Sequence, residues 1–214
     1  WAGEIGRNEL QLLNLSHNFI TVLPQFQWYG LTELYLQSNL IEGPFPPSIC
    51  SMSGLDVLDM SHNSFDGAIP QCQLPTKYFQ NFNFMKNVVK DNREPRYLDT
   101  RGKYYSFVIA VKGVDQDITR LLVSLTIIDL SNNSFERGIP EIIGSLNSLK
   151  VLNLSHNSLN GRIPDSLGKL SEIESLDLSS NQLTGNIPKS LAGIKCLEVL
   201  NLSQNHLVGH IPEG

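Results

Sequence analysis

The sequence predicts an α/β solenoid, in which the chain coils repeatedly through copies of one short unit. Two observations lead to this prediction. The phrase L-x-x-L-x-L-x-x-N, with occasional substitutions, recurs seven times in 214 residues, and most copies end in Gly-x-Ile-Pro or a close variant. The asparagines of the copies are spaced 21, 24, 70, 24, 24 and 24 residues apart. They are Asn18, Asn39, Asn63, Asn133, Asn157, Asn181 and Asn205. A near-constant period builds a stack of similar coils, each packed against its neighbours.

Each copy begins with a short predicted strand. Leu152 and Leu154 are two residues apart, as are the equivalent residues of the other copies, so both point to one side of a strand and into the core. Side by side, these strands form a parallel sheet on the concave side of the solenoid. This apolar spacing, in a period of about 24 residues, is the signature of leucine-rich repeats.

The rest of each copy closes the coil. The asparagine amide both donates and accepts hydrogen bonds, so we expect it to satisfy turn backbone in neighbouring coils. Glycine then supplies permissive dihedrals and proline fixes φ at the end of the turn. The return path carries apolar residues at helical spacing, for example Leu167, Leu170 and Ile173. This spacing predicts short helical or 3-10 segments on the convex side.

The fourth copy departs from the pattern. It reads FERGIP, with Arg137 where most other copies have glycine and with Gly138 one place later. If this place requires a positive φ, a side chain there costs roughly 1 kcal/mol or more. We therefore expect local strain at Arg137, whether this copy is a natural variant or a damaged one.

An interruption separates the third and fourth copies. The 70-residue spacing leaves 46 residues beyond one period. Residues 86–103 are polar and charged and predict an exposed loop. Residues 105–111 alternate as in a strand with one covered face, and residues 114–122 place apolar side chains on one face of a helix. We therefore expect a folded insertion that packs on the solenoid.

A degenerate repeat is the alternative for part of this insertion. The spacing of the phrase recurs in Phe79, Phe82, Phe84 and Asn87, and Asn87 lies 24 residues after Asn63. No Gly-x-Ile-Pro follows, however, which favours a true interruption.

The net charge of −5 hides an asymmetry. Residues 71–124 hold nine Lys and Arg against five Asp and Glu, a net charge of +4, whereas the remainder carries −9. A basic insertion on an acidic scaffold either steers an acidic partner or is a solvated loop whose charges keep the protein soluble. For the first case we predict one set of partner-binding residues. It comprises Lys86, Lys90, Arg93, Arg96, Arg101, Lys103 and Tyr104 in the insertion, and Tyr35 in a repeat.

Each copy places one residue between its two strand leucines, on the concave face. This concave column is Asn14, Tyr35, Asp59, Asp129, Asn153, Asp177 and Asn201. The column is either an acidic peptide-binding groove or a solvated strand face. We expect the solvated face, because only Tyr35 is aromatic and binding hot spots favour Trp, Tyr and Arg.

Four Asn-x-Ser triplets are candidate N-glycosylation sites, at Asn14, Asn132, Asn153 and Asn201. Glycans on the three that belong to the concave column would crowd that face. We therefore expect partner binding at the edges of the solenoid or at the insertion.

Two segments carry a resemblance to a known family. They are ESLDLSSNQLTGNIPKSLAGIKCLEVLNLSQNHLVGHIP, and CQLPTKYFQNFNFM followed by KYYSFVIAVKG. The ending N-x-L-x-G-x-I-P is similar to the plant-specific class of leucine-rich repeat, and nearly the whole chain resembles the membrane-proximal half of plant receptor-like proteins. In that family an island domain precedes four repeats. The resemblance thus implies three repeats in residues 1–72, an island domain in 73–124 and four repeats in 125–214.

The resemblance also implies a function. Receptor-like proteins are cell-surface receptors with a repeat ectodomain, one transmembrane helix and no kinase. It implies that the island and adjacent repeats bind a peptide or protein ligand, and that a co-receptor kinase of the somatic-embryogenesis type docks near the last four repeats. The expected location is the extracellular side of the plasma membrane, and the expected role is defence or developmental signalling.

Two cysteines fit that setting. Cys50 and Cys72 lie 22 residues apart, almost one coil, so they are able to stack within bonding distance. An extracellular location favours a disulfide between them over two thiols. Cys196 is left over, and we expect it to be a free and partly buried thiol.

The sequence shows no motif for other functions. It has no phosphate-binding loop, no Cys/His metal spacing and no kinase or hydrolase signature, so we expect no enzymatic activity, no cofactor, no metal and no nucleic-acid partner. It has neither a signal peptide nor an apolar stretch long enough to span a membrane. Because the chain begins at Trp1 in mid-phrase, we expect it to be a fragment.

Three alternative functions remain open. The first is the ectodomain of an island-containing receptor kinase, which a downstream kinase domain would identify. The second is a secreted inhibitor of the polygalacturonase-inhibitor type, although such solenoids lack an island. The third is a truncated product without function.

Overall fold

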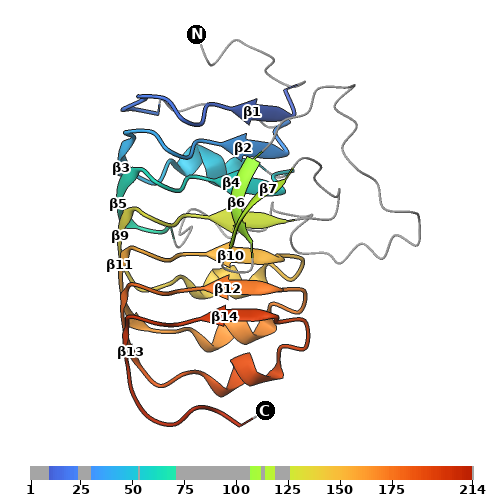
Figure 1. The fold of residues 1–214 in the computed structure, drawn as a ribbon, viewed down its shortest axis with the longest axis vertical. Coiled ribbons are helices and arrows are strands. Elements are labelled where there is room, and N and C mark those ends of the chain that lie inside the picture. The colour runs from blue at the N-terminus through green and yellow to red at the C-terminus, as the bar shows by residue number, and fades with distance from the viewer. Residues whose placement is uncertain are drawn as a thin grey trace, which may run out of the picture.

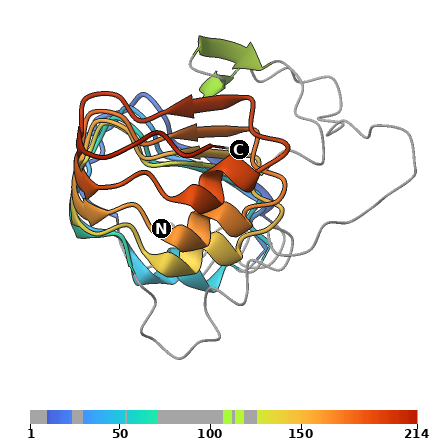
Figure 2. The same ribbon diagram turned by 90° about the horizontal axis from the view of Figure 1, so that it is seen from below.

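A computed structural model of the protein describes residues 10–23, 30–52, 54–70, 107–111, 114–118 and 126–213. These residues form a solenoid whose coils are stacked along its long axis (Figure 1). Strands line the concave face and one lateral side, and 3-10 helices line the opposite, convex face (Figure 2). The predicted α/β solenoid, with a parallel concave sheet and short 3-10 segments, is confirmed.

The concave sheet has seven parallel strands in the order β1-β2-β4-β8-β10-β12-β14. They are β1 (Leu12–Asn14), β2 (Glu33–Tyr35), β4 (Val57–Asp59), β8 (Ile127–Asp129), β10 (Val151–Asn153), β12 (Ser175–Asp177) and β14 (Val199–Asn201). The register places equivalent residues opposite one another, as with Leu152 and Leu176. One residue of the phrase therefore forms one continuous column along the sheet.

The lateral sheet has six strands in the order β15-β13-β11-β9-β5-β3. They are β3 (Glu42–Pro44), β5 (Ser64–Ala68), β9 (Ser134–Arg137), β11 (Ser158–Arg162), β13 (Gln182–Gly185) and β15 (His206–Leu207). These strands follow the repeat asparagine and lead to the Ile-Pro end of each turn. They hold neighbouring coils together on the side of the solenoid.

The described convex segments are the 3-10 helices η1 (Pro47–Ser51), η3 (Glu141–Ser145), η4 (Asp165–Lys169) and η5 (Lys189–Gly193). Each begins after an extended proline with φ between −62° and −66°. Proline sets this φ and has no N–H to satisfy, so it ends the turn and starts the helix. One apolar side chain of each, such as Leu167, is then buried in the core.

The core is a set of stacked columns. In the inner coils, Leu152, Leu154 and their equivalents are almost fully buried between the concave sheet and the convex helices, whereas in the last coil Leu200 is 43% exposed. Where the third and fourth coils meet, Phe65 and Phe135 stack with ring centroids 6.1 Å apart. Such columns are stable only when neighbouring coils cover them.

The repeat asparagines form a buried ladder. Asn157 donates from Nδ2 to the carbonyl oxygens of Leu130, Leu154 and Ser155 at 3.0, 3.2 and 3.0 Å. Its Oδ1 accepts from the N–H of Phe135 at 3.0 Å. The predicted role, satisfying turn backbone of neighbouring coils, is confirmed.

The insertion does not break the stack. Strand β8 pairs directly with β4, with Ile128 opposite Leu58. Across the same junction Asn133 donates from Nδ2 to the carbonyl oxygen of Met60 at 3.0 Å. The island boundaries at residues 73 and 124 lie outside the described residues and stay a prediction, as does the degenerate repeat at residues 79–87.

Part of the insertion forms a hairpin, β6 (Phe107–Val111) antiparallel to β7 (Val114–Ile118). The predicted strand at residues 107–111 is confirmed, but the helix expected from residue 114 is wrong over residues 114–118. Val114 and Ile118 fit a helical face, yet with Gln116 they also fit strand alternation, and pairing with β6 selects the strand. The hairpin lies over the concave sheet, across β4, β8 and β10 (Figures 1 and 2).

Arg137 has the backbone conformation that the sequence led us to test. Its φ is +69°, close to the +76° of Gly161 at the same place in the next coil. Gly138 is not among the residues with positive φ. The strain expected at Arg137 therefore exists, because a left-handed φ is unfavourable for a residue with a Cβ.

Candidate partner-binding face

The concave face beneath the hairpin is closed to solvent. Tyr35, Asp59, Asp129 and Asn153 of the concave column are all at most 5% exposed. Asp177, at the same place in the coil after Asn153, is partly buried. The expectation of a solvated strand face is therefore wrong where the hairpin crosses the sheet.

Buried apolar residues also lie on the concave face. In three central coils Val57, Ile127 and Val151 are the first concave residues of their strands, and each is at most 2% exposed. Cross-strand neighbours on a covered face are commonly β-branched residues of this kind. The concave sheet thus carries an apolar strip beside its polar column.

Two buried carboxyls lie side by side in the concave column. The register pairs Asp59 on β4 with Asp129 on β8. Asp59 Oδ1 accepts hydrogen bonds from the backbone N–H and the hydroxyl of Ser61 at 3.0 and 2.7 Å. Asp129 accepts from the N–H of Ser131 at 2.9 Å and from Nδ2 of Asn153 at 3.2 Å. We call Asp59 and Asp129 the carboxyl pair.

Burial makes the carboxyl pair difficult to ionise. Desolvation, and then the charge of Asp129, raise the pKa of Asp59 to about 7 from an ordinary value of 3.8. Desolvation likewise raises the pKa of Asp129, while hydrogen bonds from Ser131 and Asn153 and the charge of His62 lower it. The two residues therefore favour a state that retains a proton.

A second acidic group lies next to the pair. The Tyr35 hydroxyl donates to Oε2 of Glu33 at 2.9 Å, and Glu33 is 2% exposed. Burial raises the pKa of both groups. Burial, followed by the charge of Glu33, raises the pKa of the half-buried Asp56 to about 7.

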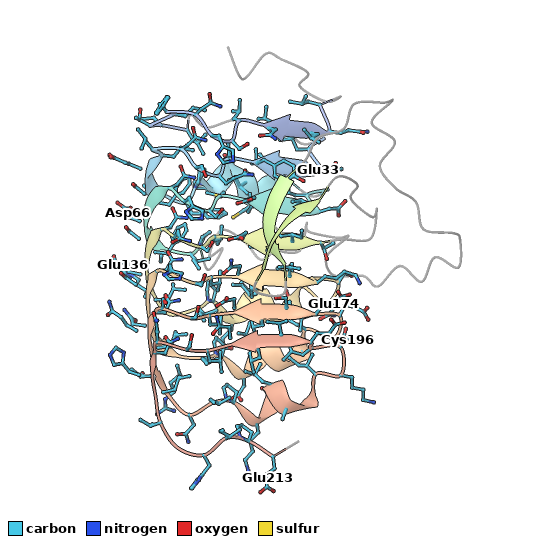
Figure 3. All side chains as sticks on the ribbon, in the orientation of Figure 1. Glu33, Asp66, Glu136, Glu174, Cys196 and Glu213 are labelled. Atoms are coloured by element: carbon cyan, nitrogen blue, oxygen red, sulfur yellow. The ribbon has the colours of Figure 1, made fainter. Side chains whose placement is uncertain are left out.

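This face has more acceptors than donors. The buried side-chain oxygens Gln37 Oε1 and Asp56 Oδ1 have no hydrogen-bond partner among the described residues. Unpaired buried acceptors are costly, and a proton held among neighbouring carboxylates reduces that cost. Figure 3 shows that these acidic groups are separate from the lateral ones: Glu33 is on β2, whereas Asp66 and Glu136 lie on the lateral sheet.

A trough of about 610 Å³ lies where two of the last four repeats pass from the lateral sheet to the convex helices η3 and η4. Arg162 lines it together with Glu141 and Asp165, which begin η3 and η4. In the preceding coil Gly138 takes the place of Arg162 and leaves that place without a side chain. The trough offers a contact edge with charges of both signs.

The predicted contact residues fall in different parts of the molecule. Lys86, Lys90, Arg93, Arg96, Arg101, Lys103 and Tyr104 lie outside the described residues. Tyr35 is completely buried, so a partner reaches its ring only if the cover moves. The basic contact surface stays a prediction.

The four glycosylation candidates differ sharply in exposure. Asn14 is exposed and Asn132 and Asn201 are partly exposed, but Asn153 is 5% exposed and its Nδ2 donates to Asp129. Glycosylation itself stays a prediction at all four. In the described arrangement Asn153 has no room for a glycan.

The cysteines are only partly described. Cys50 is buried, whereas Cys72 lies outside the described residues, so their disulfide stays a prediction. Cys196 is a free thiol as expected, but it is exposed rather than partly buried. Cys196 lies in the segment between η5 and β14.

The carboxyl pair is the feature that sequence reasoning missed. Asp59 and Asp129 were recognisable as members of one column, but they are 70 residues apart in the chain. The signal for their contact was available, since the asparagine spacing resumes in step across the insertion. Their burial has no local signal in the sequence.

The described residues show no other type of site. No group of three or more His, Cys, Asp or Glu side chains is arranged to hold a metal ion within them. Within the same residues, no helix combines the length and the hydropathy that crossing a membrane requires.

The stacked parallel coils and the asparagine ladder define a leucine-rich repeat protein, and the leucine rich repeat family model matches residues 8–65, 123–183 and 162–207. The chain belongs to this family. Among curated proteins it is 37% identical to receptor-like protein 34 of Arabidopsis thaliana over 144 residues. That match covers 65% of this chain and 14% of the receptor-like protein, so the chain spans a small part of its relative.

Two solved structures show the same architecture. One is the crystal structure of PEPR1-AtPEP1, with a TM-score of 0.69 and 25% identity, which covers 95% of this chain and 22% of that one. The other is the plant peptide hormone receptor RGFR1 in complex with RGF2, with a TM-score of 0.60 and 27% identity. That match covers 96% of this chain and 30% of the receptor. Both are repeat solenoids of plant receptors.

Proposed function

We propose that this chain is the ligand- and co-receptor-binding part of the ectodomain of a plant cell-surface receptor-like protein. The observation that carries the proposal is the single insertion into an otherwise regular stack, whose hairpin lies over the concave face. Because β4 pairs directly with β8, the repeats stack without the insertion, which is therefore not needed to complete the solenoid. The similarity of the chain to receptor-like protein 34 and to a solved peptide hormone receptor supports the same assignment.

The proposed mechanism is binding rather than catalysis. A peptide or protein ligand contacts the island and the adjacent repeats, and the ectodomain of a co-receptor kinase docks along the edge of the last four repeats. The trough beside Arg162 lies on that edge and supplies charged groups for such a contact. The two protein surfaces bind each other weakly, and a ligand shared between them strengthens the complex.

The proposed location and role follow from the same assignment. The repeats lie on the extracellular side of the plasma membrane, anchored by a transmembrane helix outside this chain, and signals pass through partner kinases in defence or development. The receptor-kinase alternative gives the same surface chemistry. Sequencing the flanking transcript separates the two, because a kinase domain downstream identifies the alternative.

Binding of a co-receptor ectodomain tests the proposal directly. We expect the chain, secreted from plant cells, to bind a purified co-receptor ectodomain of the somatic-embryogenesis type in a biosensor assay. The triple variant Lys90→Glu, Arg93→Glu and Arg96→Glu should weaken this binding at least tenfold, because the basic insertion, which precedes the docking repeats in the chain, then repels an acidic co-receptor surface instead of attracting it.

A matched control reverses three exposed lysines elsewhere. Lys169, Lys189 and Lys195 belong to the convex side, and their reversal to Glu should leave binding within twofold. Circular dichroism shows whether both variants keep the repeat fold. Unchanged affinity in the insertion variant, with the fold intact, contradicts the basic contact surface. The absence of any co-receptor binding by the folded chain contradicts the proposed function.

A further inference from the structure

The outward face of the lateral sheet differs between the first coils and the rest. Ile41, Phe65 and Phe135 point into the core, and the residues on either side of each are exposed. Each coil therefore presents two outward residues, the one directly after the repeat asparagine and the one two places later. From the third coil on, the first of these is polar, and the residues concerned are Ser64, Ser134, Ser158, Gln182 and His206.

In the first two coils the same place is apolar. Phe19 is 88% exposed and Leu40 is 51% exposed, and Val22 in the first coil is 69% exposed. The two coils are adjacent, since the N–H of Leu40 donates to the carbonyl oxygen of Ile20 at 2.9 Å. The exposure follows from the outward direction of these side chains, because Leu40 lies between two coils and Ser64 at the same place is exposed too.

Fold stability does not explain these apolar side chains. Five copies of the repeat carry a polar residue at the place of Phe19 and Leu40, so the coil closes without an apolar group there. Single exposed apolar residues are ordinary, but neighbouring ones that form a patch are typical of interaction sites. A phenylalanine ring in particular gains much from being covered by a partner.

A row of acids continues from the apolar side chains along the sheet. The second outward residue is Glu42 in the second coil, Asp66 in the third and Glu136 in the fourth, and all three are exposed. Asp66 and Glu136 lie on the outer side of the lateral sheet in Figure 3. None of the three, Glu136 beside Arg137 included, has an ion-pair partner among the described residues. Like charges on neighbouring strands are unfavourable, and cations from a partner relieve the repulsion.

The backbone between these side chains is uncovered. A Cβ added at Gly43 or at Gly67 would meet nothing within 4 Å. In a later coil the side chain of Arg162 lies over the equivalent Gly185, where an added Cβ would be 3.1 Å from the Cγ of the arginine. The second and third coils thus leave room for a partner to approach the sheet closely.

We propose that this face docks a short protein segment in which an apolar side chain is flanked by lysine or arginine. The face, which we call the lateral patch, comprises Phe19, Val22, Leu40, Glu42, Asp66 and Glu136. The apolar side chain of the segment packs between Phe19 and Leu40, and its basic side chains lie along the acids, so the charges are complementary. The lateral patch is separate from the insertion and from the trough beside Arg162, and its role goes beyond the proposed function.

Other occupants fit the lateral patch less well. The three acids repel nucleic acids and membranes with anionic headgroups. A second copy bound through the same patch, as in a symmetric dimer, brings acid against acid. A basic protein segment matches both the apolar and the charged part of the face.

Selection from a library of random linear peptides displayed on phage tests this surface on the whole chain. We expect the peptides enriched on the wild type to carry an apolar residue with Lys or Arg on both sides. The double variant Phe19→Ser and Leu40→Ser, which installs the serine of later coils, should weaken binding of an enriched peptide at least tenfold in a biosensor assay. Glu42→Lys with Asp66→Lys should also weaken it at least tenfold, and binding to the wild type should fall in roughly 0.5 M salt.

Two matched controls alter the same chemistry elsewhere. Val208→Ser with Ile211→Ser removes two exposed apolar side chains from the last coil. Glu172→Lys with Glu213→Lys reverses two acids away from the lateral patch. Both controls should keep peptide binding within twofold, and circular dichroism shows whether each variant is folded.

The proposal is overturned if no peptide is enriched, if the enriched peptides lack basic residues, or if they bind the Phe19→Ser and Leu40→Ser variant as well as the wild type. A dimer in sedimentation velocity that this variant abolishes also overturns it, because the occupant is then a second copy. None of these measurements uses a co-receptor, so failure of the co-receptor assay leaves them informative.

Discussion

At the scale of single residues, the sequence predicts some backbone conformations and not others. Arg137 was identifiable as strained because it replaces a glycine of a repeated phrase, and neighbouring copies supply the comparison. The left-handed residue before each repeat asparagine was not identifiable. His17, His62 and His156 all have φ between +52° and +55° there; histidine adopts this region more often than most residues, but a single histidine does not predict it. The asparagine hydrogen bonds impose that conformation.

Replacing Arg137 with glycine should stabilise the protein. Relief of the left-handed strain, less the greater freedom of glycine in the unfolded chain, predicts a gain of about 0.5–1 kcal/mol in the free energy of unfolding. Urea denaturation followed by circular dichroism measures it. The reciprocal control is Gly161→Ala, which places a Cβ at φ +76° and should cost a similar amount. A loss of stability in Arg137→Gly contradicts this account.

At the scale of elements, a glycine allows neighbouring convex helices to pack closely. Ser190 Oγ donates to the carbonyl oxygen of Asp165 at 2.9 Å, which draws η5 against η4. A methyl group on Gly168 would lie 2.7 Å from the carbonyl oxygen of Ser190. The close stacking of these helices therefore depends on the absence of a side chain at Gly168.

The variant Gly168→Ala should separate η4 from η5. We expect a loss of about 1–3 kcal/mol in the free energy of unfolding, typical of an overpacked contact, with the asparagine ladder still formed. Thermal unfolding gives the magnitude and hydrogen exchange at η4 and η5 its location. Gly193→Ala serves as control, because a Cβ there meets nothing within 4 Å. Equal stabilities of the two variants would show that the helices do not pack this closely in solution.

Strands and helices were predictable from the sequence where several copies of the repeat share the same spacing. Concave strands and convex 3-10 helices follow from spacings that recur in every copy. The segment at residues 114–118 has no second copy, and its apolar spacing fits both a helix and a strand. Pairing with β6, a contact between segments, decides between them.

On the scale of the whole molecule, the closed concave face changes which surfaces are available. The burial of Tyr35, Asp59, Asp129 and Asn153 in this column has no signature in the repeats taken alone. Sequence reasoning therefore found the members of the column but expected solvent over them. Among the described residues, exposed side chains remain on the lateral sheet and on the convex helices.

Glycan occupancy should follow this closed face. In the protein secreted from plant cells, we expect Asn153 to be unmodified and Asn132 to carry a glycan, because Asn153 is buried against Asp129 while Asn132 is partly exposed. Mass spectrometry of glycopeptides measures the occupancy of each site. Removing the acceptor with Ser134→Ala should abolish the Asn132 glycan. Substantial occupancy at Asn153 in folded protein would mean that this part of the face is open.

The direct pairing of β4 with β8 also has an evolutionary consequence. It fixes the two ends of the insertion on adjacent coils, and Asn133 joins those coils whatever lies between them. Because the entropy of closing a loop grows only slowly with its length, insertions of different size and sequence are interchangeable here at little cost to the scaffold. The junction thus allows the insertion to vary in length and sequence while the repeat framework stays constant.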